Sequence, residues 1–192
     1  PFTVGYLSVI TPRKGLHVLA AALERLAADG RDARLRVAGQ ALDRRYLRES
    51  ERRLRRAGLA DRVEFLGELD RAEKLAFLHS LSALVQPSIK PEVLGTVALE
   101  AQATGLPVAA PDDGAFPEML AATGGGVLFT PTDADDLAAK LAALMDDAEA
   151  ADAMGESGAD AVARLHGEAA CAEATIALLD EVLADTPTAG DT

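Results

Sequence analysis

The sequence predicts an α/β fold in which a doubly wound, parallel, six-stranded sheet has helices on both faces. Short apolar runs recur along the chain, stretches with leucine at helical spacing separate them, and glycine directly follows two of the runs. A parallel connection needs a crossover, which is usually a helix, and covering helices leave the strands apolar on both sides. Further helices without strands are expected at the C-terminal end.

Six strands are expected where apolar residues run almost without charged interruption. The first extends from Phe2 to Val9, and many of its residues are β-branched or aromatic. The other five are residues 35–38, 63–66, 83–86, 108–110 and 127–129. Gly39 and Gly67 directly follow the second and third strands, as is typical of strands that end in a tight turn. The alternation of strands with helices makes the predicted sheet Rossmann-like.

The helices are expected where apolar residues recur at three- and four-residue steps, which gives an amphipathic helix its stripe. The first stripe follows the first strand and consists of Leu16, Leu19, Leu23 and Leu26. The other helical stretches are residues 43–57, 70–80, a segment from about residue 95, a long segment after Thr132, and residues 149–165 and 168–183. Residues 1–184 are therefore expected to form one domain, and residues 185–192, which lack apolar periodicity, a disordered tail.

Composition and charge restrict the function classes. The chain has 192 residues, of which 49% are hydrophobic and 26% charged, as expected for one globular domain. Its net charge of −12 argues against nucleic acid, and no membrane contact is expected through this domain. A single cysteine, Cys171, excludes an internal disulfide. A cytoplasmic location is therefore the expectation. The start at Pro1 is compatible with an excised fragment.

The motif that says most about function lies at residues 92–105, E-V-L-G-T-V-A-L-E-A-Q-A-T-G. Seven residues separate Glu92 from Glu100, and Gly95 lies between them where a loop turns into a helix. Free N–H groups at a helix N-terminus suit a phosphate. An ionised carboxylate only accepts hydrogen bonds and so suits the vicinal hydroxyls of a sugar. The spacing therefore predicts a site for a nucleoside diphosphate sugar.

This motif resembles the donor site of retaining glycosyltransferases with the two-domain GT-B fold, a large family that includes many bacterial mannosyl- and glucosyltransferases. That family has Glu, seven residues and Glu, followed by Ala and a Gly-x-Pro-Val strand, and Gly105-Leu106-Pro107-Val108 occupies this place here. Pro87-Ser88 and Phe116-Pro117-Glu118 also match. The resemblance runs from about Val4 to about residue 184. It covers only the C-terminal half of such an enzyme, which implies an N-terminal acceptor domain that this chain lacks.

The resemblance implies a role for each charged residue of the motif. Lys14, which is followed by glycine, would contact the diphosphate, and it lies in the loop after the first strand, where open parallel sheets bind ligands. Glu92 would bind hydroxyls of the transferred sugar near the anomeric centre, and Glu100 would accept from the ribose. Lys14 and Glu92 are therefore the catalytic candidates. Each of the three also has a simpler interpretation as a solvated surface residue.

Other donor-binding residues follow from the same resemblance. The N–H groups of Leu94 and Thr96, together with Gly95, would cradle the phosphates. Arg13 is a possible second cation, because the chain has Tyr6 where the family usually has an arginine for the diphosphate. The nucleobase is expected against the loops after the second and third strands, at the positions Gly39, Gly67 and Leu69.

Three further features are interpreted as structural. Asp133-Ala-Asp135 spells the metal-binding signature of a different glycosyltransferase architecture, but it begins a helix, where acids cap; no metal is expected. Seven arginines between residues 43 and 57 are interpreted as a solvated face paired with Glu49 and Glu51, with an anionic partner or lipid as the alternative. The histidines His17, His79 and His166 show no spacing typical of a metal or catalytic pair.

The expected function is donor binding in a retaining glycosyltransferase of the hexosyltransferase type, with a UDP or GDP sugar as substrate and no cofactor. This domain alone would be inactive, because the missing half brings the acceptor. The alternatives are a non-catalytic nucleotide-binding module and half of a sugar-nucleotide epimerase of similar fold. A dehydrogenase is disfavoured because no G-x-G-x-x-G follows the first strand.

Overall fold

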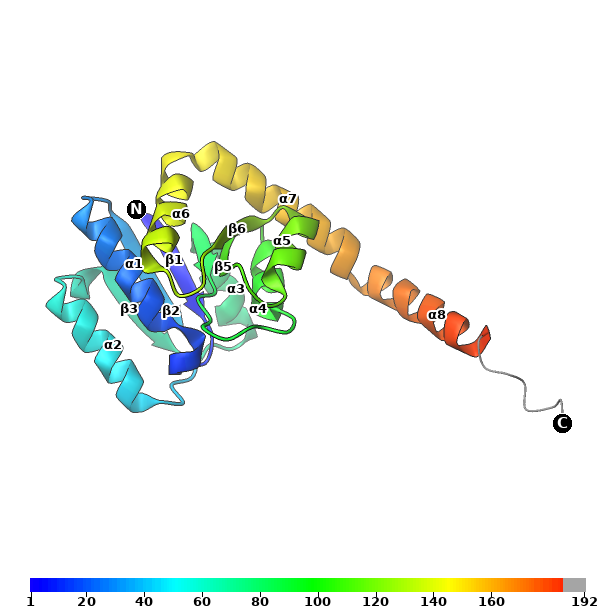
Figure 1. Cartoon of the computed structure of the whole chain (residues 1–192), viewed down its shortest axis with the longest axis horizontal. Coiled ribbons are helices and arrows are strands. Elements are labelled where there is room, and N and C mark those ends of the chain that lie inside the picture. The colour runs from blue at the N-terminus through cyan, green and yellow to red at the C-terminus, as the bar shows by residue number, and fades with distance from the viewer. Residues whose placement is uncertain (185–192) are drawn as a thin grey trace.

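A six-stranded, all-parallel sheet forms the centre of the chain in the computed structural model, which describes residues 1–184 (Figure 1). The strand order is β3-β2-β1-β4-β5-β6. The strands are β1 (Phe2–Leu7), β2 (Ala33–Ala38), β3 (Val63–Gly67), β4 (Ala83–Val85), β5 (Val108–Pro111) and β6 (Gly126–Phe129). All six correspond to predicted strands. The order reverses between β1 and β4, which places a crevice at the carboxyl ends of these two strands.

Helices cover both faces of the sheet, as predicted. One core cluster joins the sheet to α1 (Leu16–Ala28), α2 (Arg44–Arg56) and α6 (Ala134–Asp146). A second cluster, on the other face, includes residues of α3 (Arg71–His79), α4 (Thr96–Gln102) and α5 (Phe116–Thr123). Two short 3-10 turns are η1 (Pro12–Lys14) and η2 (Ala60–Arg62). The predicted leucine stripe of the first helix is buried, with all four leucines at most 1% exposed.

Helix α5 has no counterpart among the helices predicted from the sequence. Its eight residues begin with Phe116 and Pro117, and only Phe116, Met119 and Leu120 form an apolar face. A stripe of one or two turns is too short to show a helical period, although proline near the first position is typical of a helix start. Phe116 is fully buried. The helix therefore owes its place to packing on the sheet.

The last two helices extend beyond the sheet. Helix α7 (Ala148–His166) packs against α4, α5 and α6, and α8 (Glu168–Ala184) follows after Gly167, whose ψ of 156° interrupts the helix. Figure 1 shows α8 projecting away from the rest of the domain. None of its residues is buried, and Ile176, Leu179 and Leu183 are among its exposed apolar side chains. The predicted tail lies outside the described residues. In the described part of the chain, no helix has the length and apolar character needed to cross a membrane.

Candidate functional site

The candidate site lies where the loop after β1 and the loop after β4 touch. The N–H of Ile89 donates to the carbonyl of Arg13 over 2.9 Å. Gly15 has a φ of 72°, and a Cβ atom there would lie only 1.7 Å from the carbonyl oxygen of Pro87. Glycine is therefore required at residue 15 by its left-handed backbone and by the close approach of the second loop. This contact brings the side chains of Lys14 and Glu92 together.

Glu92 receives two hydrogen bonds on one oxygen. Lys14 Nζ lies 2.5 Å from Glu92 Oε1, and Ser88 Oγ donates to the same oxygen over 2.6 Å. The Lys14 and Glu92 side chains are 28% and 24% exposed, and Ser88 is buried. Burial raises the pKa of Glu92, but the hydrogen bonds from Lys14 and Ser88 and the charges of Lys14 and Arg13 outweigh it, so the pKa lies below its usual value. The carboxylate is therefore ionised at neutral pH, and its Oε2 has no hydrogen-bond partner within residues 1–184.

The backbone of Glu92 is fixed from the opposite side by the loop that leads into α5. The N–H of Ala115 donates to the carbonyl of Glu92 over 2.9 Å. A Cβ atom at Gly114, whose φ is 63°, would lie 2.6 Å from that carbonyl oxygen and 2.7 Å from the Glu92 nitrogen. Glu92 is thus held through its side chain by the β1 and β4 loops and through its backbone by the β5 loop.

Gly95 lies at the start of α4, in the segment predicted to cradle phosphates. Its φ is 61°, and a Cβ atom there would meet Met119 Cε at 2.7 Å and Phe116 Cε1 at 2.9 Å. The N–H of Ala98 makes the first bond of the helix, to the carbonyl of Gly95 over 2.9 Å. The N–H groups that precede it therefore belong to the open end of the helix. Leu94 and Thr96 are exposed beside them.

Glu100 projects from the second turn of α4 and belongs to a separate contact. Its Oε1 accepts from Lys74 Nζ of α3 over 2.6 Å. Both residues line a surface pocket of about 710 Å³, together with Leu69 at the end of the loop after β3. The structure thus brings Leu69 and Glu100 to one pocket, and Lys14 and Glu92 to another cluster.

The predicted nucleobase loops meet at the neighbouring strand ends. The N–H of Gly39 donates to the carbonyl of Gly67 over 2.7 Å. Gly39 has a φ of 131°, and a Cβ atom there would lie 1.9 Å from the carbonyl oxygen of Ser8. Gly39 and Gly67 line a pocket of about 400 Å³ with Gln40 and Leu42 among its other residues. The loops after β1, β2 and β3 therefore form one continuous edge.

Tyr6, which stands where the resembled family usually has an arginine, lies in the core. It is fully buried, and its hydroxyl donates to the carbonyl of Val9 over 3.1 Å. Burial raises its pKa. Arg13 is exposed and makes no side-chain hydrogen bond or ion pair within the described residues, although its charge lowers the pKa of Glu92. The structure thus leaves Lys14 as the one cation in contact with Glu92 within residues 1–184.

Residues 1–161 match the profile of the family described as glycosyl transferases group 1. The chain belongs to that family.

Three similar proteins show which part of a glycosyl transferase this group 1 domain represents. It is 36% identical over 136 residues to the phosphatidyl-myo-inositol mannosyltransferase of Mycolicibacterium smegmatis, which covers 71% of this chain and 34% of that protein. It superposes on Anabaena HepE in complex with UDP and glucose with a TM-score of 0.82, at 29% identity, over 96% of this chain and 48% of that one. The C-terminal domain of a group 1 protein from Francisella tularensis matches at 28% identity and a TM-score of 0.76, over 84% of both chains.

The group 1 chain therefore spans about a third of the mannosyltransferase and about half of HepE. Its sheet with added C-terminal helices is the C-terminal domain of the GT-B fold, as the sequence predicted.

The structure reveals contacts of two residues of this group 1 domain that were not predicted from the sequence, Ser88 and Lys74. Ser88 belongs to the matched motif, but its bond to Glu92 was not predicted; a serine four residues before a glutamate is a weak signal. Lys74 carries no sequence signal, because its partner Glu100 is 26 residues away on another helix. Both interactions depend on side-chain directions that the fold sets.

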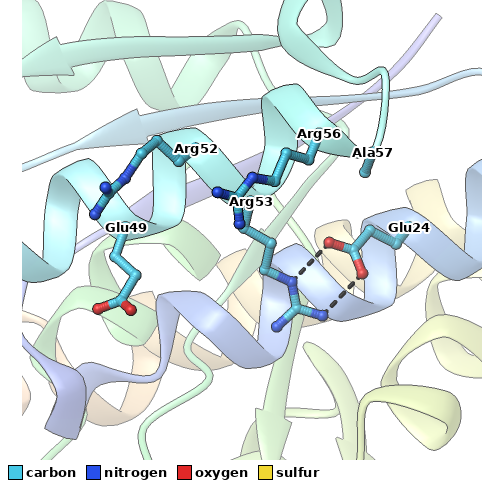
Figure 2. A pocket seen from close by; sticks show the side chains of 6 residues that line it. All are labelled: Glu24, Glu49, Arg52, Arg53, Arg56 and Ala57. Carbon is cyan, nitrogen blue, oxygen red and sulfur yellow. Dashed lines mark hydrogen bonds and ion pairs between the residues drawn. The ribbon is translucent and has the colours of Figure 1, made fainter.

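A further pocket of the group 1 domain, of about 560 Å³, lies between α1 and α2 (Figure 2). Figure 2 shows the Arg53 side chain directed from α2 towards Glu24 on α1, and its two bonds measure 2.6 and 2.8 Å. The expected pairing of the basic face with Glu49 and Glu51 is wrong, because neither glutamate forms an ion pair within residues 1–184. The other arginines of α2 are exposed, and within residues 1–184 only Arg53 forms an ion pair with a carboxylate.

The Asp133 motif caps a helix, as predicted. Asp133 Oδ1 accepts from the N–H groups of Asp135 and Asp136 over 2.9 and 3.0 Å, at the start of α6. Asp136 in turn accepts from the N–H and hydroxyl of Thr130. Asp133 thus satisfies two N–H groups of the helix N-terminus, and Asp136 ties the first turn of α6 to the preceding loop.

Proposed function

We propose that this chain binds a nucleoside diphosphate sugar and forms the donor-binding half of a retaining glycosyltransferase of the hexosyltransferase type. The observation that carries the proposal is the ionised Glu92 beside Lys14 at the β1–β4 crevice, with Glu100 in the helix that follows. Family membership supports it, as does the similarity to HepE, which was solved with UDP and glucose. The donor base, UDP or GDP, is left open.

The donor is proposed to extend along the carboxyl edge of the sheet. The nucleobase lies against the loops of Gly39 and Gly67, with Leu69 beside it, and the ribose hydroxyls donate to Glu100. The diphosphate takes charge-assisted bonds from Lys14 and from the N–H groups at Leu94, Gly95 and Thr96, with Arg13 as a more distant cation. Glu92 accepts hydroxyls of the transferred sugar through Oε2.

Lys14 and Glu92 also carry the proposed chemistry. As the acceptor oxygen bonds to the anomeric carbon, the bond from that carbon to the diphosphate breaks, and the departing phosphate takes the hydroxyl proton. Negative charge grows on the leaving phosphate and positive charge on the sugar ring. Lys14 has three donors, so it can turn one towards the phosphate while another stays with Glu92. The Glu92 carboxylate then faces the developing positive charge. We propose that no metal takes part, because Lys14 and the helix N-terminus neutralise the leaving group.

The proposal includes an N-terminal domain that supplies the acceptor and closes the cleft, and it places the reaction in the cytoplasm. Without that domain, water is not excluded from the donor, so this chain alone would bind the donor and not transfer its sugar.

A second candidate function is that of a nucleotide-binding module without catalysis. The burial of Tyr6 favours it, because the chain then lacks the second phosphate cation of the resembled enzymes.

Calorimetry with UDP, GDP and a nicotinamide dinucleotide tests the binding proposal. One nucleoside diphosphate should bind, and Lys14→Gln should weaken it by roughly ten- to a hundredfold through loss of a charge-assisted bond. Lys90→Gln, a lysine of the same loop region without an ion pair within residues 1–184, is the matched control. Preference for the dinucleotide would contradict the proposal. If a two-domain protein that contains this chain binds the nucleotide but transfers no sugar, the second candidate, a non-catalytic nucleotide-binding module, would be favoured.

A further inference from the structure

A lysine from a neighbouring helix holds Glu100. Lys74 Nζ on α3 lies 2.6 Å from Glu100 Oε1 on α4, and the two side chains are 33% and 43% exposed. The two helices are anchored in the same core cluster, through Leu78 on α3 and through Ala98 and Ala101 on α4. The contact therefore joins side chains whose backbones are fixed relative to each other.

The turn that carries Lys74 is fixed as well. Asp70 caps α3: its carboxylate accepts from the N–H of Glu73 over 2.8 Å, and the Glu73 carboxylate accepts from the N–H of Asp70 over 2.9 Å. The N–H of Lys74 then donates to the carbonyl of Asp70 over 2.8 Å. Such a capping box satisfies two otherwise free donors and prevents the first turn from fraying. Lys74 thus starts from a rigid position beside the pocket that it shares with Glu100.

The contact leaves part of the Glu100 carboxylate open. Lys74 engages Oε1, and Oε2 has no hydrogen-bond partner within residues 1–184. An ionised carboxylate has about four lone-pair sites, so it can accept from two neighbouring hydroxyls while Lys74 stays in place. The vicinal hydroxyls of a ribose are such a pair of donors.

An exposed ion pair of this kind adds little to the free energy of folding. Its main effect is to hold the Glu100 side chain in one orientation. A glutamate without a partner samples several rotamers. Ordering such a side chain when a ligand arrives weakens binding by about two- to tenfold. Because Lys74 orders the Glu100 side chain before the ligand binds, this loss of affinity is avoided.

We infer that Lys74 is a positioning residue for the donor, which holds Glu100 so that its carboxylate receives the ribose hydroxyls. The inference rests on the proposed function, because it takes ribose as the ligand of Glu100. The opposite role would be that of a competitor, which the ribose must displace from Glu100. A competitor has the opposite signature, since its removal tightens binding.

Calorimetry with UDP, GDP and the 2′,3′-dideoxy form of each separates these roles. For the nucleotide that binds, the ratio of the Kd of the dideoxy form to the Kd of the ribose form measures what the hydroxyls contribute. Lys74→Gln should lower this ratio by about two- to tenfold. Lys74→Arg keeps the positive charge and the hydrogen-bond donors, so its ratio should lie close to the wild-type ratio. Lys140→Gln, on α6 and without an ion pair within residues 1–184, should leave the ratio unchanged.

The outcomes distinguish this inference from the proposed function. No binding of either nucleotide would overturn both. A wild-type ratio near one would remove the ribose from Glu100, and with it the role of Lys74, while nucleotide binding by the chain would stand. A wild-type ratio well above one that Lys74→Gln leaves unchanged would overturn the role of Lys74 alone. Tighter binding of the ribose form by Lys74→Gln would identify a competitor. Equal weakening of both forms would place Lys74 against another part of the nucleotide.

Discussion

Lys14 and Glu92 are 78 residues apart in the sequence, yet Lys14 Nζ lies 2.5 Å from Glu92 Oε1. The pair forms because Gly15 allows the β1 loop to reach Pro87 of the β4 loop. Without a ligand, the proposed phosphate cation and the proposed sugar acceptor therefore satisfy each other. A donor that binds here has to share or replace this contact, which makes the pair sensitive to pH and to loop geometry.

The lowered pKa of Glu92 gives a prediction for stability. Because its pKa in the folded chain lies below the usual 4.5, the contribution of Glu92 is fully present above that value and is lost as the pH falls through the lowered pKa. Thermal unfolding of wild type and Glu92→Gln should therefore differ most near neutral pH and converge in acid. A difference in melting temperature that is constant from pH 3 to pH 7 would contradict the assignment. Comparison with this variant removes the contributions of other acidic groups, such as Asp136 and Asp146, whose pKa values are also lowered.

Gly15 and Gly30 provide a matched test of the loop contact. Their φ values are 72° and 75°, but a Cβ at Gly30 would meet nothing within 4 Å, whereas one at Gly15 would meet the Pro87 carbonyl. Gly30→Ala should cost about 1 to 2 kcal/mol of unfolding free energy, for the left-handed backbone alone. Gly15→Ala should cost roughly 2 kcal/mol more, because backbone has to move. Equal losses in urea unfolding would show that the loops separate easily.

The fold was readable from the sequence because buried parallel strands and long leucine stripes leave strong patterns. The stripe from Leu16 to Leu26 predicted α1. The run from Phe2 to Val9 predicted β1, which ends two residues earlier, at Leu7. Helix α5 left no comparable pattern, because its burial depends on Phe116 meeting a sheet built from distant segments. Local periodicity cannot report such a contact.

The site was only partly readable for the same reason. The motif located Glu92, Gly95 and Glu100, since their spacing is local. The partners of the two carboxylates, Ser88 and Lys74, depend on rotamers and on the packing of helices. The misjudged basic face shows the same limit: sequence spacing suggested pairs with Glu49 and Glu51 within the helix, but the one ion pair of α2 within residues 1–184 goes to α1.

The basic face of α2 predicts a salt-dependent stability. Arg44, Arg48, Arg52 and Arg56 follow one another at four-residue steps, and like charges at this spacing destabilise a helix by about 0.2 to 0.5 kcal/mol per pair. Arg48→Glu replaces two repulsive pairs by attractive ones and should stabilise the chain at low salt, with the gain fading towards 1 M salt. Arg55→Glu changes the net charge equally but places a glutamate four residues after Glu51, so it should destabilise. If both variants change the stability in the same direction, net charge and not the spacing of the charges determines the effect.

The last prediction separates the two carboxylates of the motif, which are proposed to hold different parts of one ligand. Glu100→Ala should weaken the nucleoside diphosphate and the intact sugar nucleotide alike, because ribose is present in both. Glu92→Ala should spare the diphosphate and weaken only the sugar nucleotide, because its free Oε2 is proposed to receive the transferred sugar. Each lost acceptor should cost roughly 1 to 3 kcal/mol, which calorimetry resolves. Since Lys14 loses its partner in Glu92→Ala, tighter binding of the diphosphate by this variant would still agree with the assignment. Equal losses of both ligands in both variants would show that ribose and sugar are assigned to the wrong carboxylates.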